Sequence, residues 1–353
     1  MKRSLFALLG AVSLAGGAAA QSSVTVYGLI DLGVTAYKGG QSQNRVDSGI
    51  SNGSRLGFRG TEDLGDGLNA IYDLEMPIQA DIGNVPAPFF GRESWVGLRS
   101  PRWGTLTLGR QTEFMAEFGF LYTGATMNVG AYGFHPGDYD RISGILRVDN
   151  SIKYMAILGP VKLGALVSLG EVAGSSSTGQ AKSFVASYQD GPLSAALIRT
   201  STNNQVLDPR NQLGINTLNA AALTGPLTTN RVDVHGAGMG YRIGNLWLKG
   251  MHTRVTLELP AGSPTLSTTD VNVRYDFTPL TYVGVGVARS SLENSGWNKA
   301  YVIYDYRLST RTEVYASYMH LKTNAGNRAT ALALPPSTTP TASALRVALL
   351  HRF

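Results

Sequence analysis

The chain has 353 residues, a formal net charge of +6, 15% charged residues, 42 glycines and no cysteine. The lack of cysteine excludes disulfides and thiol chemistry, and the small, scattered basic excess does not indicate nucleic-acid binding. Sparse charge with abundant glycine favours turns and close-packed strands over a helical or coiled protein. Beyond the N-terminal leader, no segment approaches 18 consecutive apolar residues, so no membrane-spanning helix is predicted.

The N-terminal segment has the three parts of a secretory leader. Lys2 and Arg3 are positive, Leu5 to Leu14 is apolar, and Ala18 to Ala20 fits a small-residue cleavage site. We therefore predict a cleaved signal peptide over residues 1–20 and a single exported domain over 21–353.

Apolar and polar residues alternate along the whole exported part, as they do in strands with two different faces. In the first strand Val24, Val26 and Ile30 oppose Tyr27 and Asp31. The same period recurs near residues 68–76, 147–156, 270–277 and 304–308, and helical spacing is absent over any comparable length.

The connections are of two kinds, which alternate along the chain. Short turns rich in Gly, Pro, Asp and Asn are expected at 63–67, 100–104, 158–160, 190–192, 242–245, 278–280 and 307–310. Longer stretches are expected as loops at 38–52, 77–88, 112–145, 171–180, 201–230, 256–268, 291–297 and 323–342. The alternation predicts an all-β antiparallel barrel of about 16 strands, an even number as bacterial membrane barrels have.

The size of this barrel decides which face lies inside. A barrel of about 16 strands is too wide for side chains to fill, so its lumen holds water. The charged face must then point inward and the apolar face outward, with closure satisfying every backbone group in hydrocarbon. Aromatic residues near strand ends are candidates for interfacial girdles: Trp103, Tyr154, Trp247, Tyr275, Tyr304 and Tyr318.

The last eleven residues form a strand with one apolar and one charged face. Leu345, Val347, Leu349 and Phe353 share the first face, and Arg346 lies on the second. An aromatic at the end of such a strand is typical of the closing strand of an outer-membrane barrel.

Several segments, in order from one end to the other, resemble the general porins of beta-proteobacteria, the trimeric Burkholderiales and Neisseria-type family. They are Ser23 to Asp31, Ser54 to Gly67, Phe90 to Arg92, Gly104 to Gln111, Arg147 to Tyr154 and His351 to Phe353. The resemblance implies a homotrimer of 16-stranded transmembrane barrels, each with the 112–145 loop folded into its lumen. It also implies a general diffusion channel of the cell outer membrane for ions and small hydrophilic solutes. The implied partners are outer-membrane lipid, lipopolysaccharide and the barrel assembly machinery. No cofactor is expected, and 200–230 carries no motif of the family.

If the 112–145 loop narrows the pore, the facing wall sets its ion selectivity. The resemblance places Arg55, Arg92 and Arg147 in a basic eyelet. Alternation independently points Arg55 and Arg147 inward, together with Arg59 and Lys153. For Arg92 the parity is less clean, because it would put Glu93 and Trp95 on the outer face. Arg110 follows the outward parity of its strand unless the strand bends.

The loop contributes candidate carboxylates opposite these cations: Glu113, Glu117, Asp138 and Asp140. Unopposed arginines favour anions, and carboxylates at the same height would cancel much of that preference. We expect a modest anion preference.

Other chemistry is weakly indicated. Gly49 to Gly53 matches an esterase elbow pattern but lies in a polar loop with no following helix. The glycines at 236, 238 and 240 lack a nucleotide-binding context. The histidines show no metal-ligand spacing, and Asp138 with Asp140 indicates a pore-lining pair rather than a calcium site. The alternative functions are a substrate-specific outer-membrane channel, a barrel enzyme and a plugged adhesive barrel.

Overall fold

The computed structural model describes residues 23–353, so the signal peptide predicted for 1–20 lies outside the described residues. One antiparallel sheet closes on itself because β1 pairs with β21 along one edge and with β2 and β3 along the other. Its members are β1 (Ser23–Gly39), β2 (Gln41–Ser48), β3 (Arg55–Gly65), β4 (Leu68–Pro77), β5 (Glu93–Ser100), β6 (Gly104–Gln111), β7 (Val148–Leu158), β8 (Val161–Ser168), β9 (Ala181–Asp190), β10 (Leu193–Asn203), β15 (Arg231–Ile243), β16 (Leu246–Glu258), β17 (Thr265–Thr278), β18 (Thr281–Leu292), β19 (Ser295–Arg307), β20 (Thr312–Thr323) and β21 (Thr341–Arg352). Since β2 and β3 occupy one position in the wall, the barrel has 16 strand positions, and that prediction is confirmed.

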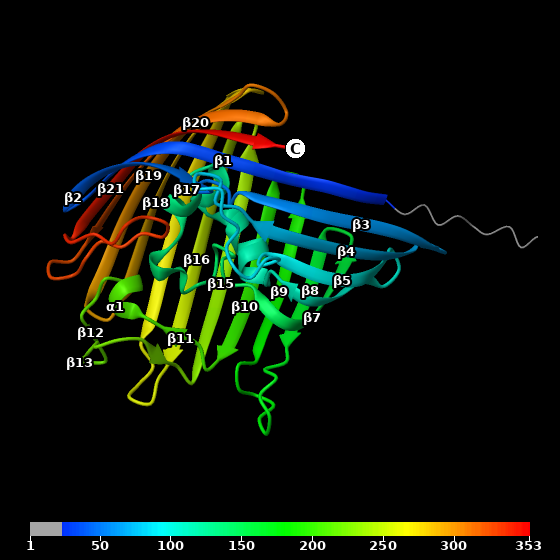
Figure 1. Cartoon of the computed structure of the whole chain (residues 1–353), viewed down its shortest axis with the longest axis horizontal. Coiled ribbons are helices and arrows are strands. Elements are labelled where there is room, and N and C mark those ends of the chain that lie inside the picture. Colours follow the sequence, from blue (N-terminus) through cyan, green and yellow to red (C-terminus); the bar gives the residue numbers. More distant parts are fainter. Residues whose placement is uncertain (1–22) are drawn as a thin grey trace, which may run out of the picture.

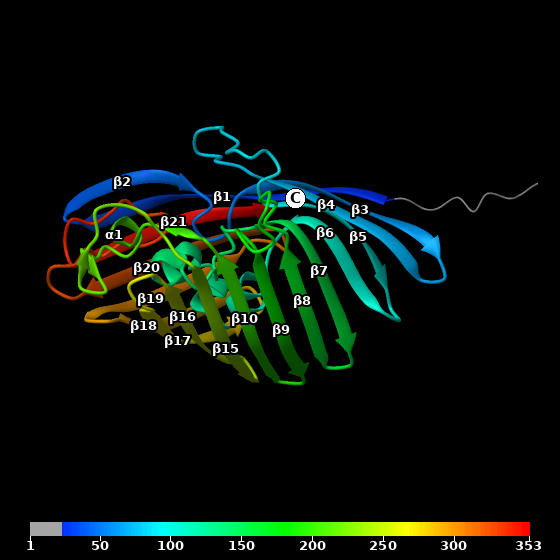
Figure 2. The ribbon, with the colours of Figure 1, turned by 90° about the horizontal axis from the view of Figure 1, so that it is seen from below.

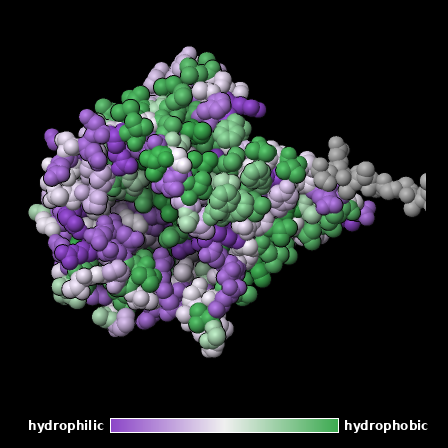
Figure 3. All heavy atoms as spheres, viewed as in Figure 1, coloured by the Kyte–Doolittle hydropathy of each residue, from purple (hydrophilic) through white to green (hydrophobic). Residues whose placement is uncertain are grey.

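The two faces of each strand differ in polarity, and this difference determines which face lies outside the barrel and which lies inside. On β1, Val24, Val26 and Val34 are more than half exposed on the outside, while Asp31 and Thr35 are fully buried inside. Space filling shows apolar side chains over much of the wall, with hydrophilic ones gathered at the end that carries the long loops (Figure 3). The predicted apolar exterior and polar interior are confirmed for this strand.

One expected girdle aromatic lies elsewhere. Trp103, Tyr154, Tyr275, Tyr304 and Tyr318 are about 40–50% exposed. Trp247 instead turns into the barrel, where its indole N–H donates to Asp276 at 3.2 Å and Arg242 stacks on its ring. Trp247 and Leu248 are adjacent in β16, so their side chains lie on opposite faces, and it is Leu248 that faces outward.

The seven short turns are all present, whereas three long loops are shorter than expected. β1 turns directly into β2 at Gly40, β16 and β17 extend to leave only 259–264, and β18 meets β19 across 293–294. At these places the strands extend into polar residues beyond the predicted ends, because pairing with the neighbouring strand satisfies the backbone hydrogen-bonding groups. Residues 49–54 then form an inward excursion between β2 and β3, not a continuation of an outer loop.

The segment between β6 and β7 folds into the barrel (Figure 1). It contains five short helical turns at Met115–Gly119, Phe120–Tyr122, Gly124–Met127, Gly130–Gly133 and Pro136–Asp138. Its Phe114, Met127 and Ile142 join inward residues such as Val185 and Met251 in one buried apolar cluster. Because the inner faces of β8 to β20 are partly apolar here, the loop packs against that side and leaves open the side of β3 to β7.

The segment between β10 and β15 covers part of the mouth at the long-loop end. It holds α1 (Pro209–Gln212) and two small two-stranded sheets, in which β11 (Val206–Leu207) pairs with β14 (Leu227–Thr228) and β12 (Thr217–Leu218) pairs with β13 (Ala221–Ala222). It contacts the inner loop through Tyr139, which donates to Gln212 at 2.9 Å. It also contacts the 324–340 loop, since Arg328 N–H donates to the carbonyl of Gly214 at 2.9 Å. Within residues 23–353, none of the helices is long and apolar enough to span a membrane.

Candidate functional site: a basic constriction beside the inner loop

Two cavities line the open side of the lumen, and they share three arginines. One, of about 520 Å³, lies against β3 to β7; the other, of about 320 Å³, lies against residues 49–53 and the inner loop. Arg55, Arg92 and Arg147 line both cavities. A solute that moves from one to the other therefore passes these three guanidinium groups.

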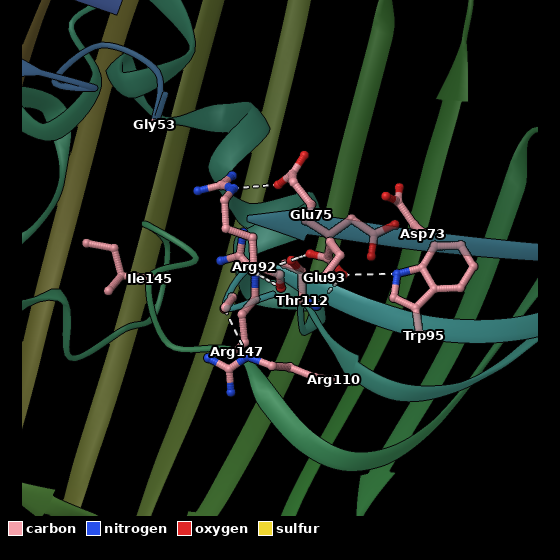
Figure 4. A network of polar contacts seen from close by, with 12 residues as sticks. Gly53, Asp73, Glu75, Arg92, Glu93, Trp95, Arg110, Thr112, Ile145 and Arg147 are labelled. Atoms are coloured by element: carbon pink, nitrogen blue, oxygen red, sulfur yellow. Dashed lines mark hydrogen bonds and ion pairs between the residues drawn. The ribbon is translucent and has the colours of Figure 1, made fainter. Parts of the chain in front are cut away.

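Each arginine is held by the polypeptide around it (Figure 4). Arg55 starts β3 and donates to the carbonyl of Gly53 at 3.4 Å. Arg147, just before β7, donates through Nε to the carbonyl of Arg92 at 2.9 Å and to Glu93 at 3.2 Å. Arg92 pairs with Glu75. These contacts fix the three cations on one wall, across from the exposed loop residue Ile145.

Three carboxylates from the wall accompany the arginines: Asp73, Glu75 and Glu93. Glu75 lies between Arg92 and Arg55, the latter at 3.4 Å. The alternation near residues 68–76 puts Asp73 and Glu75 on the same face of the strand, although neither was among the expected site residues. The sequence feature that could have identified them is the hairpin around the turn at 63–67. Counting residues back from this turn on both strands places Asp73 opposite Arg59.

Glu93 and Trp95 correct an expectation. Parity assigned both to the outer face, but they line the inner cavity, and Val96 and Leu98 face outward instead. The indole N–H of Trp95 donates to Glu93 at 3.1 Å, and Thr112 donates to the same carboxylate at 2.5 Å. Arg92 lies in the loop before β5, where strand parity does not apply.

The other two expected cations also line the larger cavity. Arg59 stacks on the ring of Tyr27 at 3.8 Å and pairs with Asp73 at 3.4 Å. Lys153 on β7 donates to the carbonyl of Thr112 at 3.0 Å and pairs with Glu117. Glu117 is thus the loop carboxylate that lies at the passage, and its side chain is 41% exposed.

Glu113, Asp138 and Asp140 lie elsewhere, in contrast to the expected position across the eyelet. All three are buried. Glu113 accepts hydrogen bonds from Thr200 at 2.6 Å and Ser183 at 3.1 Å on the barrel wall. Asp138 closes its own turn by accepting from Ser143 N–H at 2.8 Å. Buried carboxylates need such partners, and here they anchor the loop rather than face the passage.

Asp140 belongs to a buried charged cluster that fastens the loop to the wall. It pairs with His135 and accepts from Thr253 on β16 at 2.8 Å, while His135 Nε2 lies 3.7 Å from Asp270 on β17. Burial disfavours the charged forms of His135 and Asp140, but the attraction between the two side chains outweighs this effect. The pKa of His135 is raised to about 9 and that of Asp140 is lowered. For Asp138, burial raises the pKa to about 7.

The remaining expected residues lie outside the passage. Arg110 pairs with Asp149 and donates to the carbonyl of Gly91 at 2.9 Å, consistent with its outward parity. Phe353 exchanges backbone hydrogen bonds with Gly28 on β1 at 3.0 and 3.1 Å. A side chain at position 28 would clash with the Phe353 ring, so glycine is required there.

Among residues 23–353, no group of three or more His, Asp or Glu side chains is arranged to hold a metal ion. Residues 49–53, which match the esterase pattern, are folded against the inner loop: Ile50 is buried and its carbonyl accepts from Ala131 N–H at 2.7 Å. This segment therefore supports the loop.

A closed 16-stranded barrel with an apolar outside, a polar passage and an inward loop defines a channel-type outer-membrane β-barrel. The chain matches the Gram-negative porin family over residues 5–326, and it belongs to that family.

Individual relatives agree with this assignment. An outer membrane porin protein of Bordetella pertussis is 35% identical over 167 residues, which cover 40% of this chain and 43% of that protein. Outer membrane porin protein 32 of Delftia acidovorans is 36% identical over 210 residues, which cover 56% and 59%. The chain thus spans about half the length of the curated relatives it matches. Among solved structures, the anion-selective porin from Comamonas acidovorans has the same fold, with a TM-score of 0.79 at 23% identity, covering 94% of this chain and all of that one.

Proposed function

We propose that this chain forms a water-filled channel through the outer membrane, by which ions and small hydrophilic solutes diffuse, with a modest preference for anions. The observation that carries the proposal is the open side of the lumen, where two adjacent cavities share Arg55, Arg92 and Arg147. The solved structure of similar fold is described as an anion-selective porin, which agrees with this charge.

The sign of the selectivity follows from the charges that line the passage. The smaller cavity has three arginines and no carboxylate in its lining. The larger has five cations, Arg59 and Lys153 included, against Asp73, Glu75, Glu93 and Glu117. A unit charge about 5 Å from an ion in water changes its energy by roughly 0.8 kcal/mol, and salt reduces this. Paired charges mostly cancel, so the excess predicts a preference of a few-fold to about tenfold.

The proposal extends to assembly and boundaries. We propose that residues 21–353 form one barrel after removal of the leader 1–20, and that three copies associate. In support of the latter, Val24, Val26 and Val34 on β1 and Val96 on β5 are exposed apolar residues of the outer wall. Membrane lipid surrounds the remaining wall, and the assembly machinery inserts the barrel.

The experiment is the zero-current potential of purified protein in a planar bilayer under a KCl gradient. We expect stable conductance in steps and a potential of the sign for anion selectivity. A cation-selective potential would assign the filter to the carboxylates. Absence of conductance would overturn the open channel and favour an enzyme or adhesive barrel, while saturable, ligand-blocked current would indicate a substrate-specific channel.

A further inference from the structure

A further cavity, of about 590 Å³, lies at the short-turn end of the barrel and is called the exit pocket below. Residues of β15 to β19 line it, together with the two short turns that hold Asn245 and Leu280. The short turns lie at the end of the barrel away from α1 (Figure 2). In outer-membrane barrels such turns face the periplasm. A solute that has passed the constriction therefore reaches the exit pocket on its way out of the channel.

Two arginines of the exit pocket lie against aromatic rings. The guanidinium of Arg242 lies over the ring of Trp247, 4.6 Å from its centre, and that of Arg274 lies over Tyr282 at 3.8 Å. A guanidinium presents its N–H groups along its edges, so one that lies over a ring can still bond a carboxylate. The pocket thus offers flat apolar surface and N–H donors side by side.

The cations of the exit pocket outnumber its counter-charges. Among the described residues, its lining holds Arg242, Arg274 and Arg307 against a single carboxylate, that of Asp276. Asp276 is already engaged, since Arg274 donates to it through Nε at 2.7 Å and Trp247 through its indole N–H at 3.2 Å. Neither Arg242 nor Arg307 makes an ion pair within residues 23–353. Two positive charges are therefore available to an incoming anion.

Two carboxylates of the adjoining wall are held by other groups. Asp305 and Glu313 accept hydrogen bonds from Asn128 of the inner loop at 2.8 and 2.9 Å. Glu313 also pairs with Arg352 at 2.8 Å. Neither carboxylate lines the exit pocket, so the surplus of positive charge in its lining remains.

We propose that the exit pocket binds a small carboxylate that carries an aromatic ring, as benzoate does. Arg242 on β15 and Arg307 on β19 attract the carboxylate from the two sides of the pocket. Trp247, Arg274 and Tyr282 lie on the strands between them, and the ring packs against this layer of rings and guanidinium groups. The volume of the pocket is within the range of small-molecule sites.

An anion without a ring would use only part of this surface. Acetate offers charge but nothing to pack against Trp247, and benzyl alcohol offers the ring without the charge. The combination of both features in one pocket favours the aromatic carboxylate. This inference rests on the proposed channel, through which such a solute would reach the pocket.

The test uses the purified full-length protein in a neutral detergent, with benzoate, acetate and benzyl alcohol as probes. Saturation-transfer NMR titrations give the affinity of each probe. We expect benzoate to bind the parent about tenfold more tightly than either other probe. The double variant Arg242→Gln/Arg307→Gln should bind benzoate about tenfold more weakly. Trp247→Leu should weaken the binding of benzoate and leave that of acetate unchanged.

Two control variants separate the exit pocket from the rest of the channel. Arg102→Gln removes an exposed arginine from the short turn between β5 and β6, at the same end of the barrel. Arg147→Gln removes a cation from the constriction. Both variants should bind benzoate like the parent.

Three outcomes would overturn the proposal. They are equal binding of benzoate and acetate to the parent, unchanged benzoate binding by the double variant, and a loss of binding in Arg147→Gln instead. Should the double variant not fold, Arg307→Gln alone decides, with an expected loss of about threefold. Conductance in KCl tests the channel separately: a conducting protein that binds benzoate no better than acetate retains the proposed function and loses this site.

Discussion

Glu75 is the counter-charge shared by two of the three arginines at the constriction. Its carboxylate contacts Arg55 and Arg92 and accepts a hydrogen bond from Tyr27 at 3.0 Å. Arg147 is differently placed, since its partner Glu93 also accepts from Thr112 and Trp95. Removing the charge of Glu75 and removing the charge of Arg147 should therefore shift the ion selectivity in opposite directions.

Replacing Glu75 with Gln should increase the anion preference, because Arg55 and Arg92 lose their shared counter-charge. An effect of up to about 0.8 kcal/mol corresponds to roughly fourfold in the anion-to-cation permeability ratio, less at high salt. The zero-current potential measures it. A shift toward cations would contradict the placement of Glu75 at the filter.

Arg147→Gln should reduce the anion preference by a similar factor, because it removes one of three cations shared by the two cavities. The matched control is Arg110→Gln, which removes an arginine from the end of the adjacent β6 but one that pairs with Asp149 outside the passage. Bilayer potentials of the two variants should differ. If both change the potential equally, Arg147 has no special role.

At the scale of elements, the inner loop is held to the barrel wall by polar and apolar contacts together. Asn128 donates to Asp305 at 2.8 Å and to Glu313 at 2.9 Å, and Lys299 donates to the carbonyl of Phe134. The cluster of His135, Asp140 and Asp270 adds ionic contacts. These anchors fix the loop on the β8 to β20 side and so determine where the passage lies.

The His135 anchor should depend on pH. Because the folded-state pKa of His135 is raised to about 9 from 6.5, its contribution is complete below about pH 6.5 and is lost as pH rises through about 9. Lys299 and Asp270 face the same cluster, so the loss will be partial. Above pH 9 we expect lower protection of residues 130–142 against hydrogen exchange, relative to the intrinsic rate at each pH, and noisier current in the parent.

His135→Gln should show that lower protection already at pH 7, with little further change in protection up to pH 10. The neutral side chain keeps a hydrogen-bonding group but cannot form the ion pair. A variant with the same pH profile as the parent would assign the transition to another group.

At the scale of the whole molecule, closure of the barrel is reinforced by a buried arginine. Arg346 on β21 is fully buried, contacts Asp31 on β1 at 3.2 Å and Asp47 on β2, and donates to Tyr315 on β20 at 2.9 Å. It therefore joins the first and last strands and both their neighbours.

Arg346→Met should destabilise the closed barrel by about 3–5 kcal/mol, because Asp31 is left buried without a cation and Asp47 keeps only Arg45, at 3.3 Å. The loss is measurable as a lower temperature for conversion of the folded to the unfolded band on gel electrophoresis. Arg352→Met, a partly exposed arginine of the same strand that pairs with Glu313 at 2.8 Å, is the control and should cost less. Equal stability of the two variants would contradict this account.

Strand number, the apolar exterior and the inward direction of Arg55, Arg59 and Lys153 were predictable from the sequence, because side chains alternate strictly along a regular strand. Tertiary structure alone decided the rest. The left-handed φ of 52° at Asn150 and the register shift between Gly109 and Gln111 interrupt the strand alternation between Lys153 and Arg147. Alternation along β7 therefore does not explain why Arg147 lies at the passage. The carboxylates of the inner loop turned to the wall because burial requires partners for each of them, and those partners come from strands distant in sequence. Local periodicity carries no information about such contacts, so only the folded barrel shows which charges reach the passage.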